Sequence, residues 1–81
     1  MRINQAPVNK KLRVQSFQSD EFREFSDVES RLMHLGFMAG ELVRVARKAP
    51  LFEGPFLVEV RGRYVALTSE EAGLVLVEVI E

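Results

Sequence analysis

The sequence predicts a mainly β fold: a small closed sheet of about five short strands with one inserted α-helix. Three observations support this. Segments in which apolar and polar residues alternate recur along the chain, and glycine or proline separates them. One segment, before Gly36, has the three-and-four spacing of an amphipathic helix. Finally, a chain of 81 residues suits a single domain, and closing its sheet would leave no strand edge exposed.

The N-terminal residues are mostly polar. Residues 1–10 contain Pro7 and no regular apolar pattern, so we expect a flexible arm followed by one domain over residues 11–81. Leu12 and Val14 alternate with polar neighbours and predict the first strand.

The segment after this strand allows two interpretations. It could form one helix over residues 20–35, because Ser19-Asp20 offers N-cap chemistry. It could instead form a short helical turn and then a helix from about residue 27, because Ser26-x-x-Glu29 is a capping box. The capping chemistry favours the second interpretation.

Residues 31–40, Arg-Leu-Met-His-Leu-Gly-Phe-Met-Ala-Gly, predict a helix end, a sharp reversal and a strand start. Gly36 stands where the chain leaving a helix adopts a left-handed conformation, which costs glycine no Cβ clash. Gly40 follows Ala39 and suits the positive-φ position of a type II turn. Phe37, between the two glycines, is expected in the core.

The second half of the chain predicts the remaining strands and a short helical turn. Gly62 suits a hairpin turn, and Thr68 begins a helical turn that Gly73 stops. The last strand is nearly all apolar, which is typical of a strand covered on both faces. The strands are expected over residues 41–48, 56–61, 64–67 and 74–80, with a loop over 51–55.

Composition limits the function classes. The net charge of −1 provides no basic field for nucleic acid, and the absence of cysteine excludes disulfides, thiolate metal sites and iron–sulfur clusters. The N-terminus lacks the apolar region of a signal peptide, and no apolar run is long enough to cross a bilayer. We therefore expect a cytoplasmic protein that does not insert into the membrane.

Candidate chemistry is sparse. His34 is the only histidine and has no ligand partner at helical spacing, so it is interpreted as a surface imidazole near a helix C-terminus. No serine lies in an activating motif, and no glycine-rich phosphate loop occurs. The sequence predicts a non-enzymatic protein with no catalytic residue, no metal site and no cofactor.

The partner surface is inferred from residues that are hard to place inside. Met38 lies in a turn, Leu51 and Phe52 lie in a loop, and Leu57 faces outward on its strand. We expect Leu51 and Phe52, with Met38 as neighbour, to form an exposed apolar contact surface.

A set of basic residues could add to this surface. They are Arg44, Arg47, Lys48, Arg61 and Arg63. A solvated face is the favoured interpretation, ahead of an ion-pair surface for an acidic protein partner and of a nucleic-acid surface.

The order of these motifs resembles the FeoA family of bacterial ferrous iron transport. The resemblance begins with R-L-x-x-L-G-x-x-x-G at residues 31–40. It continues through Ala49-Pro50-Leu51, Gly54-Pro55 and Val60-Arg61-Gly62 to the closing run from Leu74 to Val79, and it covers about residues 12–80. It implies an SH3-like barrel.

The resemblance also implies a function. The family member would work with FeoB, the membrane iron transporter that carries a GTPase domain, by docking on it and modulating it. Weak self-association stays open. An alternative is an SH3-like accessory domain in iron-dependent transcriptional regulation, since the C-terminal domains of DtxR-type repressors resemble FeoA.

Overall fold

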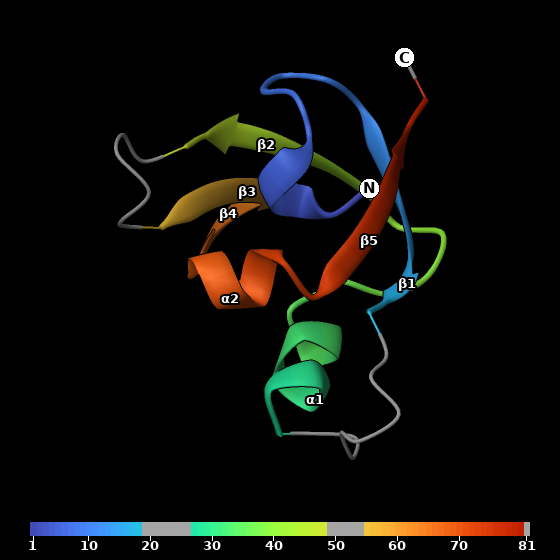
Figure 1. The fold of residues 1–81 in the computed structure, drawn as a ribbon, viewed down its shortest axis with the longest axis vertical. Helices are drawn as coiled ribbons and strands as arrows, with labels where there is room; N and C mark the ends of the chain where they lie inside the picture. The colour runs from blue at the N-terminus through green and yellow to red at the C-terminus, as the bar shows by residue number, and fades with distance from the viewer. Residues whose placement is uncertain (19–26, 49–54, 81) are drawn as a thin grey trace.

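The computed structural model describes residues 1–18, 27–48 and 55–80, and it shows five antiparallel strands in one sheet (Figure 1). The order across the sheet is β4-β3-β2-β1-β5. The strands are β1 (Leu12–Phe17), β2 (Leu42–Arg47), β3 (Phe56–Val60), β4 (Arg63–Leu67) and β5 (Val75–Val79). The helical elements are η1 (Ile3–Gln5), α1 (Asp27–His34) and α2 (Ser69–Ala72). The predicted mainly β fold with one inserted helix is confirmed.

The period-two pattern of the strands builds the core. Alternate residues of β2 and β3, such as Val45 and Val58, are fully buried, and their neighbours Arg44 and Glu59 face outward. Full burial of one such valine contributes at most about 1.5–3 kcal/mol of hydrophobic stabilisation. The register shifts after Val45, where the strand pair bends and the sheet curls around these side chains.

The two outer strands are β4 and β5, and helical segments lie beside them. α2 connects β4 to β5, and η1 contacts both α2 and β5 (Figure 1). Arg2 forms a bridge with Leu76, and the backbone N–H of Val77 donates to the Met1 carbonyl oxygen at 2.7 Å. The β5 edge is therefore covered by the N-terminal segment.

This packing differs from the flexible arm expected for residues 1–10. Ile3 and Ala6 are fully buried in the core. They are three residues apart, which is one turn of a 3₁₀-helix, so η1 turns both toward the sheet. Two apolar residues three positions apart in a mostly polar segment are too weak a pattern to predict a helical turn from the sequence.

The last strand also differs from expectation. Val75 and Val77 are fully buried, but Leu76 and Glu78 are half-buried and Val79 is 38% exposed. β5 is therefore covered on one face and only partly on the other, because it is an outer strand of the sheet.

α1 ends in a Schellman motif. The backbone N–H of Phe37 donates to the Leu32 carbonyl oxygen at 3.0 Å, and that of Gly36 donates to the Met33 carbonyl oxygen at 3.1 Å. Gly36 has a φ of +112°, and the buried side chains of Phe37 and Leu32 belong to one core cluster. Residues 19–26 lie outside the described residues, so the two interpretations of the helix start are not distinguished.

The following reversal attaches the start of β2 to β1. Gly40 has a φ of +91°, and the N–H of Glu41 donates to the Met38 carbonyl oxygen at 3.0 Å, as a type II turn requires. The N–H of Gly40 donates to the Val14 carbonyl oxygen at 2.8 Å, and the N–H of Val14 donates to the Glu41 carbonyl oxygen at 2.9 Å. The turn therefore extends the pairing between the two strands.

α2 is a single helical turn with a complete capping box. The Thr68 hydroxyl accepts from the N–H of Glu71 at 3.1 Å, and the Glu71 carboxylate accepts from the N–H of Thr68 at 2.9 Å. Glu71 is 8% exposed and also forms an ion pair with Arg31 of α1. The two helices are thus linked by a largely buried carboxylate.

We expect a β-branched side chain at Gly40 to destabilise the protein strongly. No atom would crowd a Cβ there, so the cost lies in the positive φ, about 1–3 kcal/mol for Gly40→Val. The matched variant is Gly62→Asn, with a φ of +76° in an exposed turn, where we expect less than about 1 kcal/mol. Denaturant unfolding measures both; equal stability of Gly40→Val and wild type would refute the turn.

A second expectation concerns the N-terminal segment. Ile3→Ala should lower the free energy of unfolding by about 2–5 kcal/mol, because it leaves a cavity in the core. The control is Val8→Ala, whose side chain is 39% exposed and should matter little. Similar unfolding midpoints for the two variants would contradict the packing of η1.

Candidate partner-binding surface

The outer face of β2 and β3 carries charge at its centre. Arg44 lies directly opposite Glu59 in the ladder, and the guanidinium Nη2 is 2.8 Å from the carboxylate Oε1. Both side chains are partly exposed, at 43% and 32%. The two side chains neutralise each other's charge, and their aliphatic parts cover the surface between the two strands.

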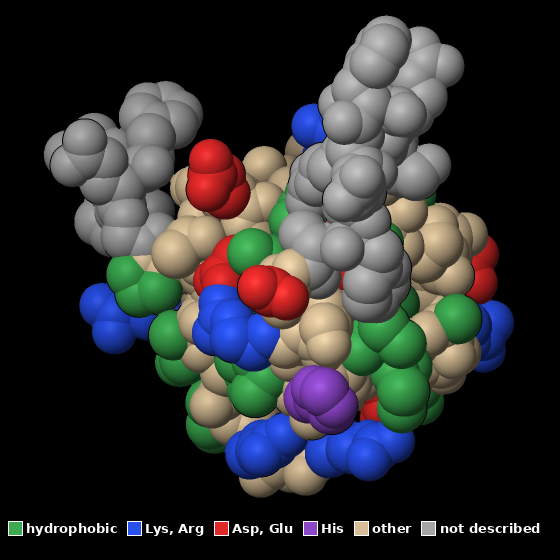
Figure 2. All heavy atoms as spheres, turned by 90° about the horizontal axis from the view of Figure 1, so that it is seen from below, with side chains coloured by type: hydrophobic (Ala, Val, Ile, Leu, Met, Phe, Trp, Pro, Cys, Tyr) green, Lys and Arg blue, Asp and Glu red, His purple; other side chains and the backbone are tan. Residues whose placement is uncertain are grey.

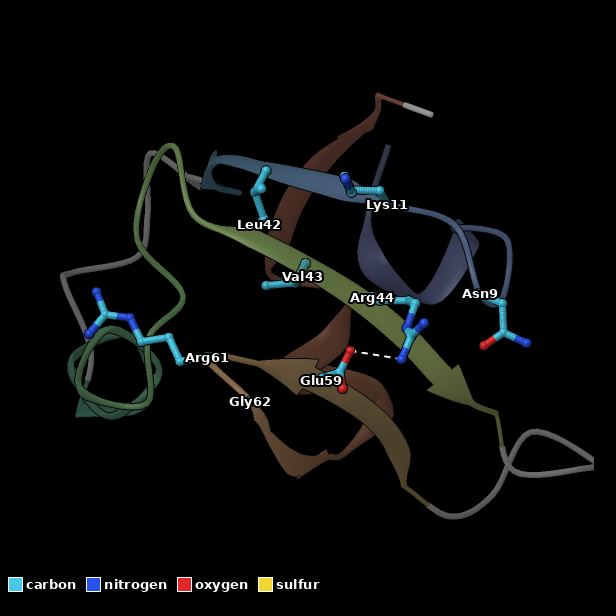
Figure 3. A pocket seen from close by; sticks show the side chains of 8 residues that line it. All are labelled: Asn9, Lys11, Leu42, Val43, Arg44, Glu59, Arg61 and Gly62. Carbon is cyan, nitrogen blue, oxygen red and sulfur yellow. Dashed lines mark ion pairs between the residues drawn. The ribbon is translucent and has the colours of Figure 1, made fainter.

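Beside this pair runs an open groove of about 450 Å³ (Figure 3). The backbone N–H of Asn9 donates to the Val45 carbonyl oxygen at 2.8 Å, which fixes the N-terminal segment along β2. Asn9 lies at one end of the groove, and the hairpin turn between β3 and β4 forms the other end. The lining residues are Asn9, Lys11, Leu42, Val43, Arg44, Glu59, Arg61 and Gly62.

The hairpin turn is made of Arg61 and Gly62. Both have positive φ angles, +53° and +76°, which is the conformation of a two-residue type I′ turn. The Arg61 Nε donates to the Glu41 Oε2 at 3.3 Å. The side chain of Arg61 is therefore directed toward the turn that begins β2.

Three residues expected in a partner surface lie on β2 and β3. Arg47 is exposed and pairs in register with the half-buried Leu57, while Arg44 is held by Glu59. The structure thus brings Arg44, Arg47 and Leu57 onto one pair of strands.

Met38 is 40% exposed and lies in the turn before β2. Leu51 and Phe52 lie outside the described residues, so the expected contact surface of Met38, Leu51 and Phe52 stays a prediction.

Sequence reasoning missed two exposed apolar residues on the outer face of β2 and β4. Leu42 is 45% exposed and Tyr64, which lies opposite Glu59, is 57% exposed. The alternation of a strand could have predicted that Leu42 faces outward, because it stands two residues before the outward-facing Arg44.

The basic residues do not form one cluster. Arg63 donates through Nη2 to the Leu35 carbonyl oxygen at 3.1 Å, at the end of α1 where unpaired carbonyls carry partial negative charge. His34 is exposed in the last turn of the same helix. Figure 2 shows basic side chains gathered beside the imidazole and acidic ones farther along this face. Arg61 therefore interacts with Glu41 and Arg63 with the end of α1, so the two arginines are directed to different partners.

The described parts of the chain contain no cluster of three or more metal-ligating histidine, cysteine or carboxylate side chains. Within the same residues, no helix has the length and apolar character needed to cross a membrane.

Comparison with known proteins identifies close structural relatives. A family model described as the FeoA domain matches residues 1–79. FeoA of Stenotrophomonas maltophilia, solved with zinc and described as an SH3 domain protein, is 33% identical with a TM-score of 0.81; the match covers 96% of this chain and 89% of that chain. FeoA of Chlorobium tepidum is 26% identical with a TM-score of 0.79, covering 100% and 71%.

A third solved structure, the FeoA-like protein of Clostridium acetobutylicum, is 25% identical with a TM-score of 0.79, covering 100% of this chain and 87% of that chain. No match was found among curated proteins. The SH3-like class that the family resemblance implied is confirmed.

We expect the isolated protein to bind Fe²⁺ only weakly. One histidine and scattered carboxylates offer little affinity for a borderline metal, so the dissociation constant should exceed about 1 μM. Anaerobic titration calorimetry measures it, with His34→Ala as the variant that removes the only imidazole. A stoichiometric site tighter than this limit would contradict the expectation.

Proposed function

The chain belongs to the FeoA family, and we propose that it is a non-enzymatic accessory protein of bacterial ferrous iron uptake. It docks on a FeoB-type membrane transporter, on the cytoplasmic side where the GTPase domain lies, and modulates it. The Stenotrophomonas maltophilia relative is described as a candidate ferrous iron transport activating factor, which supports this function.

The outer face of β2, β3 and β4 carries the proposal. It combines exposed apolar side chains, Leu42 and Tyr64, with the charged residues Arg44, Arg47 and Glu59. Aromatic and arginine side chains contribute strongly to protein–protein interfaces, and charges around them favour one partner over others.

The loop after β2 belongs to the same proposal. Leu51 and Phe52 stand four and five residues after Arg47 along the chain, so they are proposed as further contacts at this end of the face. Leu57 contributes from β3. Met38, at the other end of β2, would contact the partner only across a footprint that spans the whole strand.

We expect the double variant Arg47→Glu, Tyr64→Ser to weaken capture of the transporter's GTPase-bearing part about tenfold or more. Both side chains are exposed, so the free energy of unfolding should change by less than about 1 kcal/mol. Purified wild type and variant are compared by titration calorimetry against the cytosolic part of the transporter.

The matched control is Arg2→Glu, Val79→Ser, which makes the same change of charge and also replaces an exposed hydrophobic side chain by serine, beside the β5 edge. It should bind as wild type does. Absence of binding by the wild type would refute the docking function, and equal weakening by both variants would refute the assigned face. Sedimentation of the protein alone reports self-association.

A further inference from the structure

Independently of the docking function, we infer that the outer edge of β4 pairs with the same edge of a second copy of this chain. The two strands run antiparallel about a two-fold axis. The unpaired backbone groups of this edge, its lack of charge and its self-complementary sequence support such a pair.

The backbone of β4 points outward at two residues. β4 is an outer strand, and its ladder with β3 begins at the two-residue turn, where Val60 and Arg63 form the first pair. The residues that close such a hairpin are hydrogen-bonded to each other, and bonded and non-bonded pairs alternate after them. The N–H and carbonyl groups of Tyr64 and Ala66 therefore point away from β3.

These backbone groups lie on an open edge. Within the described parts of the chain none of them has a backbone partner, whereas the N-terminal segment covers the edge of β5. α2 contacts β4 but begins at Ser69, beyond the end of the strand. Tyr64 is 57% exposed, and Ala66 is exposed as well. A further strand can therefore approach the edge and extend the sheet.

The edge lacks the features that usually prevent strand pairing. Proline, lysine and inward-facing charges protect the edges of many sheets. Residues 64–67, Tyr-Val-Ala-Leu, contain none of these. Arg63, the charged residue of β4, donates to the Leu35 carbonyl oxygen at 3.1 Å and is thus directed toward α1. No charge within residues 64–67 opposes the approach of a second strand.

The sequence of β4 is complementary to itself. Antiparallel pairing about Val65 places Tyr64 opposite Ala66 of the second copy, so every outward N–H and carbonyl group of these residues is bonded. A large ring then faces a methyl group. The two Arg63 residues lie at opposite ends of the pair and do not repel each other strongly. Registers centred on Tyr64 or on Ala66 would set the other residue opposite one outside the partner strand.

The short contact predicts a weak dimer. Two strands of five residues bury less surface than the roughly 1,200 Å² at which stable interfaces begin. We expect a dissociation constant of about 10 μM to 1 mM. Because the same edge is used by both copies and the edge of β5 is covered, the assembly closes as a dimer.

Analytical ultracentrifugation of the full chain tests the pairing. Wild type should pass from monomer to dimer between about 10 μM and 1 mM. Ala66→Pro removes an outward N–H, which an edge strand tolerates, and should remain monomeric throughout. Circular dichroism checks that the variant is folded. A wild type that is still monomeric at about 1 mM would overturn the inference.

The matched control is Val79→Pro, which makes the corresponding change on the other outer strand. The N–H of Ile80 donates to the Lys11 carbonyl oxygen of the segment before β1, so the N–H of Val79 points away from β1. This variant should dimerise as wild type does. Equal loss of the dimer in both proline variants would show a general effect of proline and overturn the assignment to β4.

Introduced cysteines test the register, because the chain has none of its own. Positions 64 and 66 of opposite copies would have Cα atoms about 5.5 Å apart, which permits a disulfide. The two copies of position 64 would be diagonal neighbours at about 7–8 Å, which does not. With diamide as oxidant, Tyr64→Cys mixed with Ala66→Cys should cross-link about tenfold faster than either variant alone. Equal rates would overturn the register.

Capture of the transporter separates this inference from the docking function. If the wild type dimerises but does not bind the transporter, the docking function fails and the inference stands. If the wild type remains monomeric and Ala66→Pro lowers transporter affinity, the β4 edge holds a strand of the transporter. In that case the second copy is the wrong occupant and the docking function stands.

Discussion

Two hydrogen bonds between the Gly40 turn and β1 hold the halves of the sheet in register. The β1–β2 ladder pairs only Leu12 with Val43 and Arg13 with Leu42, so the bonds that connect Val14 with Gly40 and Glu41 extend a short contact. A slip of one residue would turn the buried face of β2 outward. It would bury Arg44 and remove one side of the groove. The turn therefore determines both the core and the outer face.

Local chemistry explains what the sequence could predict. Gly36, Gly40 and Gly62 all have the positive φ that their turns require, and the alternation of Val43 and Val45 with Arg44 turns the valines inward and the arginine outward. The buried N-terminal segment was not predictable in this way, because Ile3 enters the core by contacts with the distant end of the chain. Glu71 is buried for a similar reason: its partner Arg31 belongs to another helix.

The candidate surface, too, was predictable from the sequence only in part. Arg47 is exposed because the register shift after Val45 breaks the alternation that would turn it inward, whereas the outward direction of Leu57 follows from strand periodicity. The groove does not, since Lys11 and Arg61 are far apart in sequence and are brought together by the curl of the sheet. Alternation indicates which side chains face out, whereas tertiary structure determines which of them share a site.

The pairing of the first strand with the last has a consequence for biosynthesis. Leu12 pairs with Val79, and Met1 is hydrogen-bonded to Val77, so β1 has β5, a strand far along the chain, as its second neighbour besides β2. The β2–β3–β4 meander involves neighbours in sequence and can form earlier. During translation, β1 leaves the ribosome long before β5 does. The sheet can therefore be completed only after β5 has left the ribosome, and until then one edge of β1 stays unpaired.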